Sequence, residues 1–147
     1  MSVRTIIIPV SAVVPTKDRA SALKRTLQSL AGQGILPAEL IVVDGSDAND
    51  SRVVVETWAE QAGLECKVVW LHAEQHGAAA QRNRGVDVAT QPFVWFFDDD
   101  ILFEPECVSR LWTAIEHQSG LGGVSARCTL ASRIIARTAN LAALPAR

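Results

Sequence analysis

Short apolar segments rich in β-branched residues alternate along the chain with longer segments in which apolar residues recur every three or four positions. The first kind of segment is typical of buried strands and the second of amphipathic helices. Strands are predicted at residues 10–15, 40–43, 66–71, 93–97 and 122–128. This alternation predicts an α/β fold, in which a mostly parallel sheet has helices on both faces.

Helices are predicted wherever apolar residues share one helical face. One helix is expected over residues 77–88. The apolar faces of three others carry Leu23, Leu27 and Leu30, then Val54, Trp58 and Ala62, then Val108, Leu111, Trp112 and Ile115. Near the end of the chain, an amphipathic helix is predicted from Ile134, Ile135, Leu141 and Leu144, with Arg133 and Arg137 on its other side. We therefore expect an α/β unit over residues 1–128 and a helical tail over residues 129–147.

Three consecutive aspartates, Asp98, Asp99 and Asp100, follow the apolar segment 93–97. If the strand continues through them, Asp98 and Asp100 share one side and Asp99 points away. Two strand steps then separate the pair by roughly 6.6 Å, where two unit charges repel by about 2.5 kcal/mol at an effective dielectric of about 20. A divalent cation such as Mg²⁺ or Mn²⁺ would relieve this repulsion, since both prefer carboxylate oxygen. On this segment alone, the alternative that Asp99 and Asp100 are turn residues or helix caps fits equally well.

Polar residues also follow the other predicted strands, at residues 16–19, 44–47 and 72–76. In open α/β sheets, ligands bind in the crevice beyond the carboxyl ends of the strands. These segments and the aspartates therefore predict a binding crevice at one edge of the sheet. Because any junction between a strand and a loop turns polar, the pattern supports a site without defining it.

The composition indicates a globular domain, and the net charge indicates that its ligand is small. With 147 residues, 48% of them hydrophobic, the chain is long enough for one domain with its own core. A formal net charge of -2 argues against nucleic acid as a partner, because non-specific phosphate binding needs a basic surface. Cys66, Cys107 and Cys128 fit neither a disulfide framework nor a structural zinc site, and indicate reduced thiols in a cytoplasmic protein. The apolar run at residues 6–8 is too short to span a membrane and lacks an export cleavage pattern.

Four segments, in their order and spacing, resemble the nucleotide-binding half of family 2 glycosyltransferases with the GT-A fold. They are residues 11–19 (SAVVPTKDR), 39–46 (ELIVVDGS), 77–85 (GAAAQRNRG) and 98–100 (DDD). The resemblance is collective, because a bare Asp-x-Asp has little weight by itself. It implies that residues 1–128 form a Rossmann-like GT-A subdomain that binds a nucleotide sugar.

The resemblance also implies a role for Asp44 in recognising the base. Asp44 would accept a hydrogen bond from a base N–H, usually that of uracil. A hydrogen bond to an ionised carboxylate contributes about 1.5–3 kcal/mol, which is enough to discriminate against a base without the donor. The alternative role of Asp44 is to cap the turn at Gly45 and Ser46.

Further roles follow for the residues around the aspartates. By resemblance, Thr16 and Arg19 would border the nucleotide, and Arg82 would add a positive charge near it, although an arginine on a helix is more often a surface or ion-pair residue. Asp98 would approach the ribose or reach the metal ion, Mn²⁺ or Mg²⁺, and Asp100 would bind that ion directly. The ion would stabilise the negative charge that grows on the leaving nucleotide.

One part of the family pattern is missing. Family members of this kind invert the anomeric centre, and a carboxylate in their later half acts as general base toward the acceptor hydroxyl. No Asp or Glu follows Glu116 in this chain, and His117 is the one candidate base after it. We therefore expect a fragment in which residues 129–147 begin a missing acceptor half, or else a stand-alone nucleotide-binding remnant. The apolar face of the tail also allows a homodimer, whereas membrane contact is the weaker interpretation.

The leading hypothesis is the donor domain of an inverting, metal-dependent glycosyltransferase that moves a sugar from a nucleoside diphosphate, by preference UDP, to an unknown hydroxyl. The alternative is a non-catalytic module or subunit that binds a nucleotide sugar. A sugar nucleotidyltransferase is disfavoured because no glycine-rich phosphate loop follows the first strand. A phosphorelay receiver is disfavoured because the acid triplet lies late in the chain.

Overall fold

The computed structural model describes residues 4–62, 65–117, 122–129 and 133–137. Within these ranges, none of the helices is long and apolar enough to cross a membrane. The elements, in chain order, are β1 Ile6–Thr16, α1 Ala20–Ala31, β2 Ile35–Asp44, α2 Asp50–Ala62, β3 Lys67–His72, α3 Ala78–Val88, β4 Phe93–Phe96, β5 Leu102–Phe103, α4 Cys107–His117, β6 Ser125–Thr129 and β7 Arg133–Arg137.

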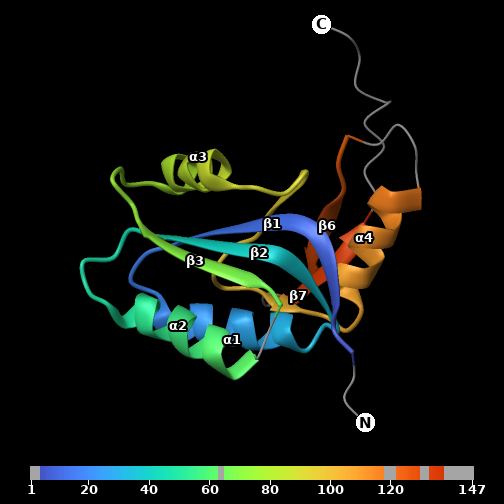
Figure 1. Cartoon of the computed structure of the whole chain (residues 1–147), viewed down its shortest axis with the longest axis horizontal. Helices are drawn as coiled ribbons and strands as arrows, with labels where there is room; N and C mark the ends of the chain where they lie inside the picture. Colours follow the sequence, from blue (N-terminus) through green and yellow to red (C-terminus); the bar gives the residue numbers. More distant parts are fainter. Residues whose placement is uncertain (1–3, 63–64, 118–121, 130–132, 138–147) are drawn as a thin grey trace, which may run out of the picture.

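A four-stranded parallel sheet with the order β3-β2-β1-β4 forms the centre of the fold. Helices α1 and α2 lie on one face of this sheet and α3 covers the other (Figure 1). Val14 and Val42 pack into the core with α1 and α2, whereas Val13 and Val43 pack on the α3 side. Because both faces are covered, β1 and β2 are almost continuously apolar, as is typical of parallel sheets. The predicted α/β class is confirmed.

Helix α3 approaches the sheet closely at Gly85. A β-carbon at this position would overlap the side chain of Val13 in β1. Glycine removes this conflict and lets the helix backbone lie against the strand. The first turns of α3 can therefore reach the carboxyl ends of the neighbouring strands.

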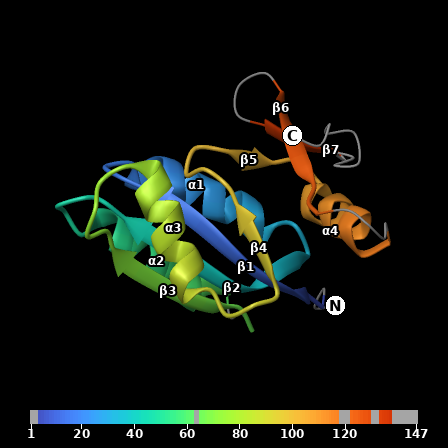
Figure 2. The same cartoon turned by 90° about the horizontal axis from the view of Figure 1, so that it is seen from above.

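A second sheet contains three short strands in the order β5-β7-β6. Strand β5 is parallel to β7, and β6 is antiparallel to it. Figure 2 shows this sheet together with α4 at one side of the main sheet. The strand predicted at residues 122–128 corresponds to β6, whereas β5 was not predicted, because a two-residue strand carries no periodicity.

The helix predicted over the tail is wrong where the structure describes it. Residues 133–137 form β7, whose backbone pairs with β6 from Arg133 opposite Thr129 to Arg137 opposite Ser125. Ile134 and the residue after it are both β-branched, which favours a strand. The spacing of so few apolar residues does not distinguish a helix from a strand. The rest of that prediction, including Leu141 and Leu144, lies outside the described residues. The homodimer predicted from the tail therefore loses its structural basis at residues 133–137.

Glu39 links three parts of the fold through a buried carboxylate that is 1% exposed. It accepts hydrogen bonds from Ser11 Oγ at 2.7 Å, from Thr90 N at 3.0 Å and from Lys67 Nζ at 3.2 Å. Burial raises the pKa of Glu39, but the hydrogen bonds from Ser11, Thr90 and Lys67 outweigh it and hold this pKa below its ordinary value. Glu39 therefore ties β1 and β3 to β2 and fixes the loop that leads into β4.

Cys66 and Cys107 are both buried, and Cys66 is a free thiol, as the sequence predicts. Burial raises the pKa of Cys66 to about 11. Because the thiolate is the reactive form, this residue is a core side chain and not a candidate nucleophile.

Candidate functional site

The carboxyl ends of β1, β2 and β4 meet at one edge of the main sheet. A cleft of about 660 Å³ lies there. It is lined by residues from the start of α1, from the loop and helix after β2, and from the turn after β4, including Asp18, Arg19, Arg25, Ser46, Asp50 and Asp100. Of the site residues predicted from the sequence, Arg19 and Asp100 line this cleft.

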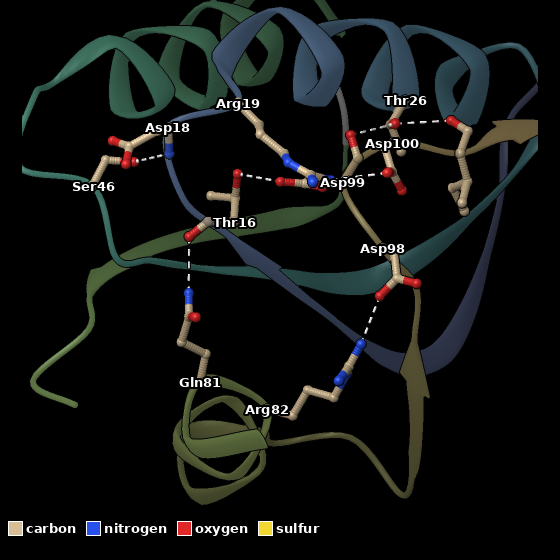
Figure 3. A network of polar contacts seen from close by, with 11 residues as sticks. Thr16, Asp18, Arg19, Thr26, Ser46, Gln81, Arg82, Asp98, Asp99 and Asp100 are labelled. Carbon is tan, nitrogen blue, oxygen red and sulfur yellow. Dashed lines mark hydrogen bonds and ion pairs between the residues drawn. The ribbon is translucent and has the colours of Figure 1, made fainter. Parts of the chain in front are cut away.

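The three aspartates after β4, which we call the acid turn (Asp98, Asp99 and Asp100), do not continue the strand. Strand β4 ends at Phe96, and the chain turns at Asp99 and Asp100. Asp98 points toward α3, whereas Asp100 lies near the start of α1 on the other face of the sheet (Figure 3). The prediction that Asp98 and Asp100 share one side is therefore wrong, because strand alternation stops where the strand ends.

Each exposed aspartate of the acid turn pairs with its own arginine. Arg82 Nη2, from α3, donates a hydrogen bond of 2.6 Å to Asp98 Oδ1. Arg19 Nη1, at the start of α1, donates one of 2.9 Å to Asp100 Oδ2. The side chains of Asp98 and Asp100 are 58% and 52% exposed, so both carboxylates remain accessible to solvent. The ion-pair role that the sequence left open for Arg82 is the one that the structure contains.

Asp99 is the buried member of the acid turn, with 5% of its surface exposed. Thr16 Oγ1, at the end of β1, donates a hydrogen bond of 2.7 Å to Asp99 Oδ2. Burial raises the pKa of Asp99, and the Thr16 hydrogen bond and the charge of Arg19 oppose this rise. The Thr16 hydroxyl, predicted to border a nucleotide, is therefore bound to the acid turn.

Asp44 is fully buried at the end of β2. Its Oδ1 accepts hydrogen bonds from the backbone N–H and the hydroxyl of Ser46, and Trp70 Nε1 donates one of 3.2 Å to its Oδ2. This is the turn-capping role that the sequence left as an alternative. Recognition of a base by Asp44 stays a prediction, and because Asp44 is fully buried, it requires neighbouring side chains to move and expose a carboxylate oxygen.

Gln81, in the first half of α3, is a site residue that the sequence reading missed. Its side chain is buried, and Nε2 donates hydrogen bonds of 2.8 Å to both Thr16 O and Val43 O. These carbonyls lie at the carboxyl ends of β1 and β2, where both site loops begin. One feature of the sequence could have identified Gln81: it is a polar residue on the face of the predicted helix that packs against the sheet.

The structure thus gathers five of the six predicted residues around the acid turn, and Asp44 lies beside one of them, opposite Thr16 in the pairing of β2 with β1. The five are Thr16, Arg19, Arg82, Asp98 and Asp100. Two accessible carboxylates beside two guanidinium groups offer ligands for a cation and partners for phosphate oxygen at the same edge of the sheet.

A sequence model of glycosyl transferase family 2 matches residues 11–135, and the chain belongs to this family. Similar proteins include AmsB, an amylovoran biosynthesis glycosyltransferase of Erwinia amylovora, 29% identical over 78% of this chain and 38% of that protein. A PGL/p-HBAD biosynthesis glycosyltransferase of Mycobacterium tuberculosis is 32% identical over 74% of this chain and 42% of its own length. Validoxylamine A glucosyltransferase of Streptomyces hygroscopicus is 32% identical over 71% of this chain and 25% of its length. The chain thus spans between a quarter and about two fifths of these relatives.

Solved structures of glycosyltransferases share the fold. The mannosyltransferase PcManGT of Pyrobaculum calidifontis, solved with GDP-Man and Mn²⁺, superposes with a TM-score of 0.68 at 23% identity, over 82% of this chain and 36% of that one. TarS of S. aureus, residues 1–349 with UDP, gives a TM-score of 0.62 at 25% identity, over 74% of this chain and 32% of that one. The predicted GT-A fold and the predicted family are both confirmed.

Proposed function

We propose that this chain is the donor-binding part of a glycosyltransferase that moves a sugar from a nucleoside diphosphate to a hydroxyl acceptor. The single observation that carries the proposal is the acid turn, which presents Asp98 and Asp100 to solvent beside Arg82 and Arg19. Family membership supports it, as do the names of the relatives, which are glycosyltransferases. UDP is the preferred donor nucleotide of this proposal, and the TarS complex contains UDP.

The residues present fit a divalent cation, Mn²⁺ or Mg²⁺. Across the described ranges, no group of three or more His, Cys, Asp or Glu side chains is arranged to hold a metal ion. One or two carboxylates that complete their coordination with substrate phosphates and water are the usual arrangement for Mg²⁺ at nucleotide sites. Asp100 would hold the ion because it lines the cleft, and Asp98 would join it only after leaving Arg82. The bound ion would stabilise the negative charge on the departing diphosphate.

The chain's own side chains have complementary tasks. With a cation bound at Asp100, Arg19 would be free to pair with a phosphate oxygen, and Arg82, if released by Asp98, would do the same from α3. Thr16 would border the nucleotide through its backbone and methyl group, since its hydroxyl is held by Asp99. Asp44 would recognise the base once the side chains that bury it have moved aside.

An inverting single displacement is the mechanism that we propose for the transfer. It requires a general base within hydrogen-bonding reach of the acceptor hydroxyl. Residues 117–147 contain no Asp or Glu, and this observation favours a second candidate, a module that binds a nucleotide sugar without transferring it. Release of free sugar from a UDP-sugar by this chain would favour the enzyme, and tight binding without release would favour the module.

The nucleotide preference is tested by calorimetric titration of UDP, GDP, ADP and CDP in the presence of Mn²⁺. We expect UDP to bind most tightly. Equal affinity for the four would contradict the preference for uracil, and binding of none would contradict the nucleotide site itself.

A further inference from the structure

Thr26 lies in the middle of α1, where it faces the acid turn and is completely buried. Its Oγ1 lies 2.8 Å from Asp99 O and 2.8 Å from Ile101 O. These two carbonyls belong to the residues immediately before and after Asp100. A hydroxyl has a single proton to donate, so Thr26 shares it between the two carbonyls and holds both close to one point.

The acid turn is also held through the Asp99 side chain. Thr16 Oγ1 donates to Asp99 Oδ2 at 2.7 Å, and Asp99 is buried (Figure 3). The backbone around Asp100 and the residue before it are therefore anchored to α1 and β1. The Asp100 side chain is left half-exposed at the cleft.

We propose that Thr26 is a positioning residue of the cation site, which fixes the backbone on both sides of Asp100 and so directs that carboxylate into the cleft. Asp99 is the anchor of the same turn and not a ligand. The inference rests on the proposed function, because it concerns the cation assigned to Asp100. Buried groups that orient a metal ligand typically change metal affinity by about 10- to 100-fold when they are removed.

Thr26 suits a clean test because a fully buried side chain cannot touch a bound ion or nucleotide. The same helix offers a matched control in Ser29. Its hydroxyl accepts a hydrogen bond of 3.2 Å from Phe103 N and donates one of 2.8 Å to the Thr26 carbonyl, so it ties α1 to β5 and not to the acid turn. Removing either hydroxyl should destabilise the fold, but only one of the two should affect the cation.

The experiment titrates Mn²⁺ into the full chain with excess UDP, reads free Mn²⁺ by electron paramagnetic resonance, and records the thermal unfolding of each variant. Thr26→Val keeps the side-chain shape without the hydroxyl and is expected to weaken Mn²⁺ binding by about tenfold or more. Thr26→Ser restores the hydroxyl and should bring the affinity back to near that of the unmodified chain. Ser29→Ala should lower Tm and leave Mn²⁺ affinity unchanged.

The outcomes separate this inference from the proposed function. If the unmodified chain binds Mn²⁺ and Thr26→Val binds it equally well, the positioning role is overturned. If Thr26→Val does not fold, Thr26→Ala decides the role of Thr26, and Asp99→Asn, whose amide oxygen can still accept from Thr16, decides that of Asp99. If Asp99→Asn keeps its affinity for Mn²⁺, Asp99 is an anchor of the turn. If it loses as much Mn²⁺ affinity as Asp100→Asn does, Asp99 is a ligand and the anchoring role is overturned. If the unmodified chain binds no Mn²⁺, the proposed cation site is wrong, and the role of Thr26 is wrong with it.

Discussion

Arg19 Nη1 lies 2.9 Å from Asp100 Oδ2 and 3.5 Å from Asp99 Oδ1, so one guanidinium group neutralises the acid turn on the side of the cleft. On the α3 side, Arg82 neutralises Asp98 in the same way. Each arginine thus holds a carboxylate for which a divalent cation would compete. Guanidinium groups pair as well with phosphate as with carboxylate, so binding of a cation would release them toward a diphosphate.

The first prediction follows from this exchange of partners. Arg19→Met should raise the affinity for Mn²⁺ in the absence of nucleotide by a few-fold, since an exposed ion pair contributes about 0.2–1 kcal/mol. The same variant should weaken UDP binding in the presence of Mn²⁺ by about tenfold, because a charge-assisted phosphate contact is lost. Two calorimetric titrations, one of Mn²⁺ and one of UDP, measure the two effects.

Arg84→Met is the matched control for this pair of titrations. Arg84 is exposed on α3, has no ion pair with a described residue, and its loss makes the same change in net charge. We expect both affinities to stay unchanged in this variant. If Arg84→Met changes the affinities for Mn²⁺ and UDP as much as Arg19→Met does, Arg19 acts through net charge alone. That result would contradict an exchange of its partner from carboxylate to phosphate.

The second prediction concerns the base and Asp44. If Asp44 recognises uracil, Asp44→Ala should reduce the preference of the chain for UDP over CDP. It should also cost about 1 kcal/mol of stability, because the hydrogen bonds that cap the turn at Ser46 are lost. Calorimetry with both nucleotides and denaturation in urea read the two effects separately.

A comparison variant removes one hydrogen-bond donor from the Asp44 carboxylate and keeps the carboxylate itself. Trp70→Phe removes the 3.2 Å hydrogen bond to Asp44 Oδ2 and leaves the Ser46 contacts in place. The preference for UDP should be kept or increased in this variant. Unchanged selectivity in Asp44→Ala would limit Asp44 to the structural role.

The class of fold was predictable because local sequence determines it. Segments such as residues 40–43 are apolar and rich in β-branched residues, which favours a strand. The tail was mispredicted because a short apolar segment fits a strand and a helix equally well. Pairing with β6 made Arg133–Arg137 a strand, and that choice depends on a neighbour in space.

The residues proposed for the site could be named from the sequence, but their geometry could not. The identity of Asp98 and Asp100 follows from the motif, but their directions depend on where β4 stops and on Thr26, which lies 73 positions before Asp99. The partners of Asp44 could not be inferred either, because Trp70 is brought beside it only by the pairing of β2 with β3. Contacts of this kind are set by the assembled sheet.

The third prediction tests Gln81 as the link between α3 and the ends of β1 and β2. Gln81→Leu keeps the size of the side chain and removes its two hydrogen bonds to Thr16 O and Val43 O. Val43 O then loses a donor in a buried position, so the free energy of unfolding should fall by about 1–3 kcal/mol. Urea denaturation measures this change, and Asn83→Leu on the exposed part of the same helix is the control. A loss of similar size in both variants would contradict a specific role of Gln81.

The fourth prediction concerns Glu39 and pH. Because hydrogen bonds hold the pKa of Glu39 below its ordinary value, the folded state binds this proton less readily than the unfolded state. The stabilisation is therefore complete above the ordinary pKa of about 4.3 and is lost as pH falls through the lower folded-state pKa. Glu39→Gln should be less stable than the unmodified chain at pH 7, and the difference should shrink toward pH 3. A constant difference between the two proteins over this range, in urea denaturation, would show that the charge of Glu39 has no part in stability.

The most direct test of the account is the affinity of the chain for UDP with and without Mn²⁺, measured by calorimetry on the unmodified protein and on Asp100→Ala. We expect Mn²⁺ to strengthen UDP binding by about tenfold or more, equivalent to about 1.4 kcal/mol, and Asp100→Ala to abolish this gain. Equal UDP affinity with and without Mn²⁺ in the unmodified chain would contradict the claim that the acid turn holds a cation for the diphosphate.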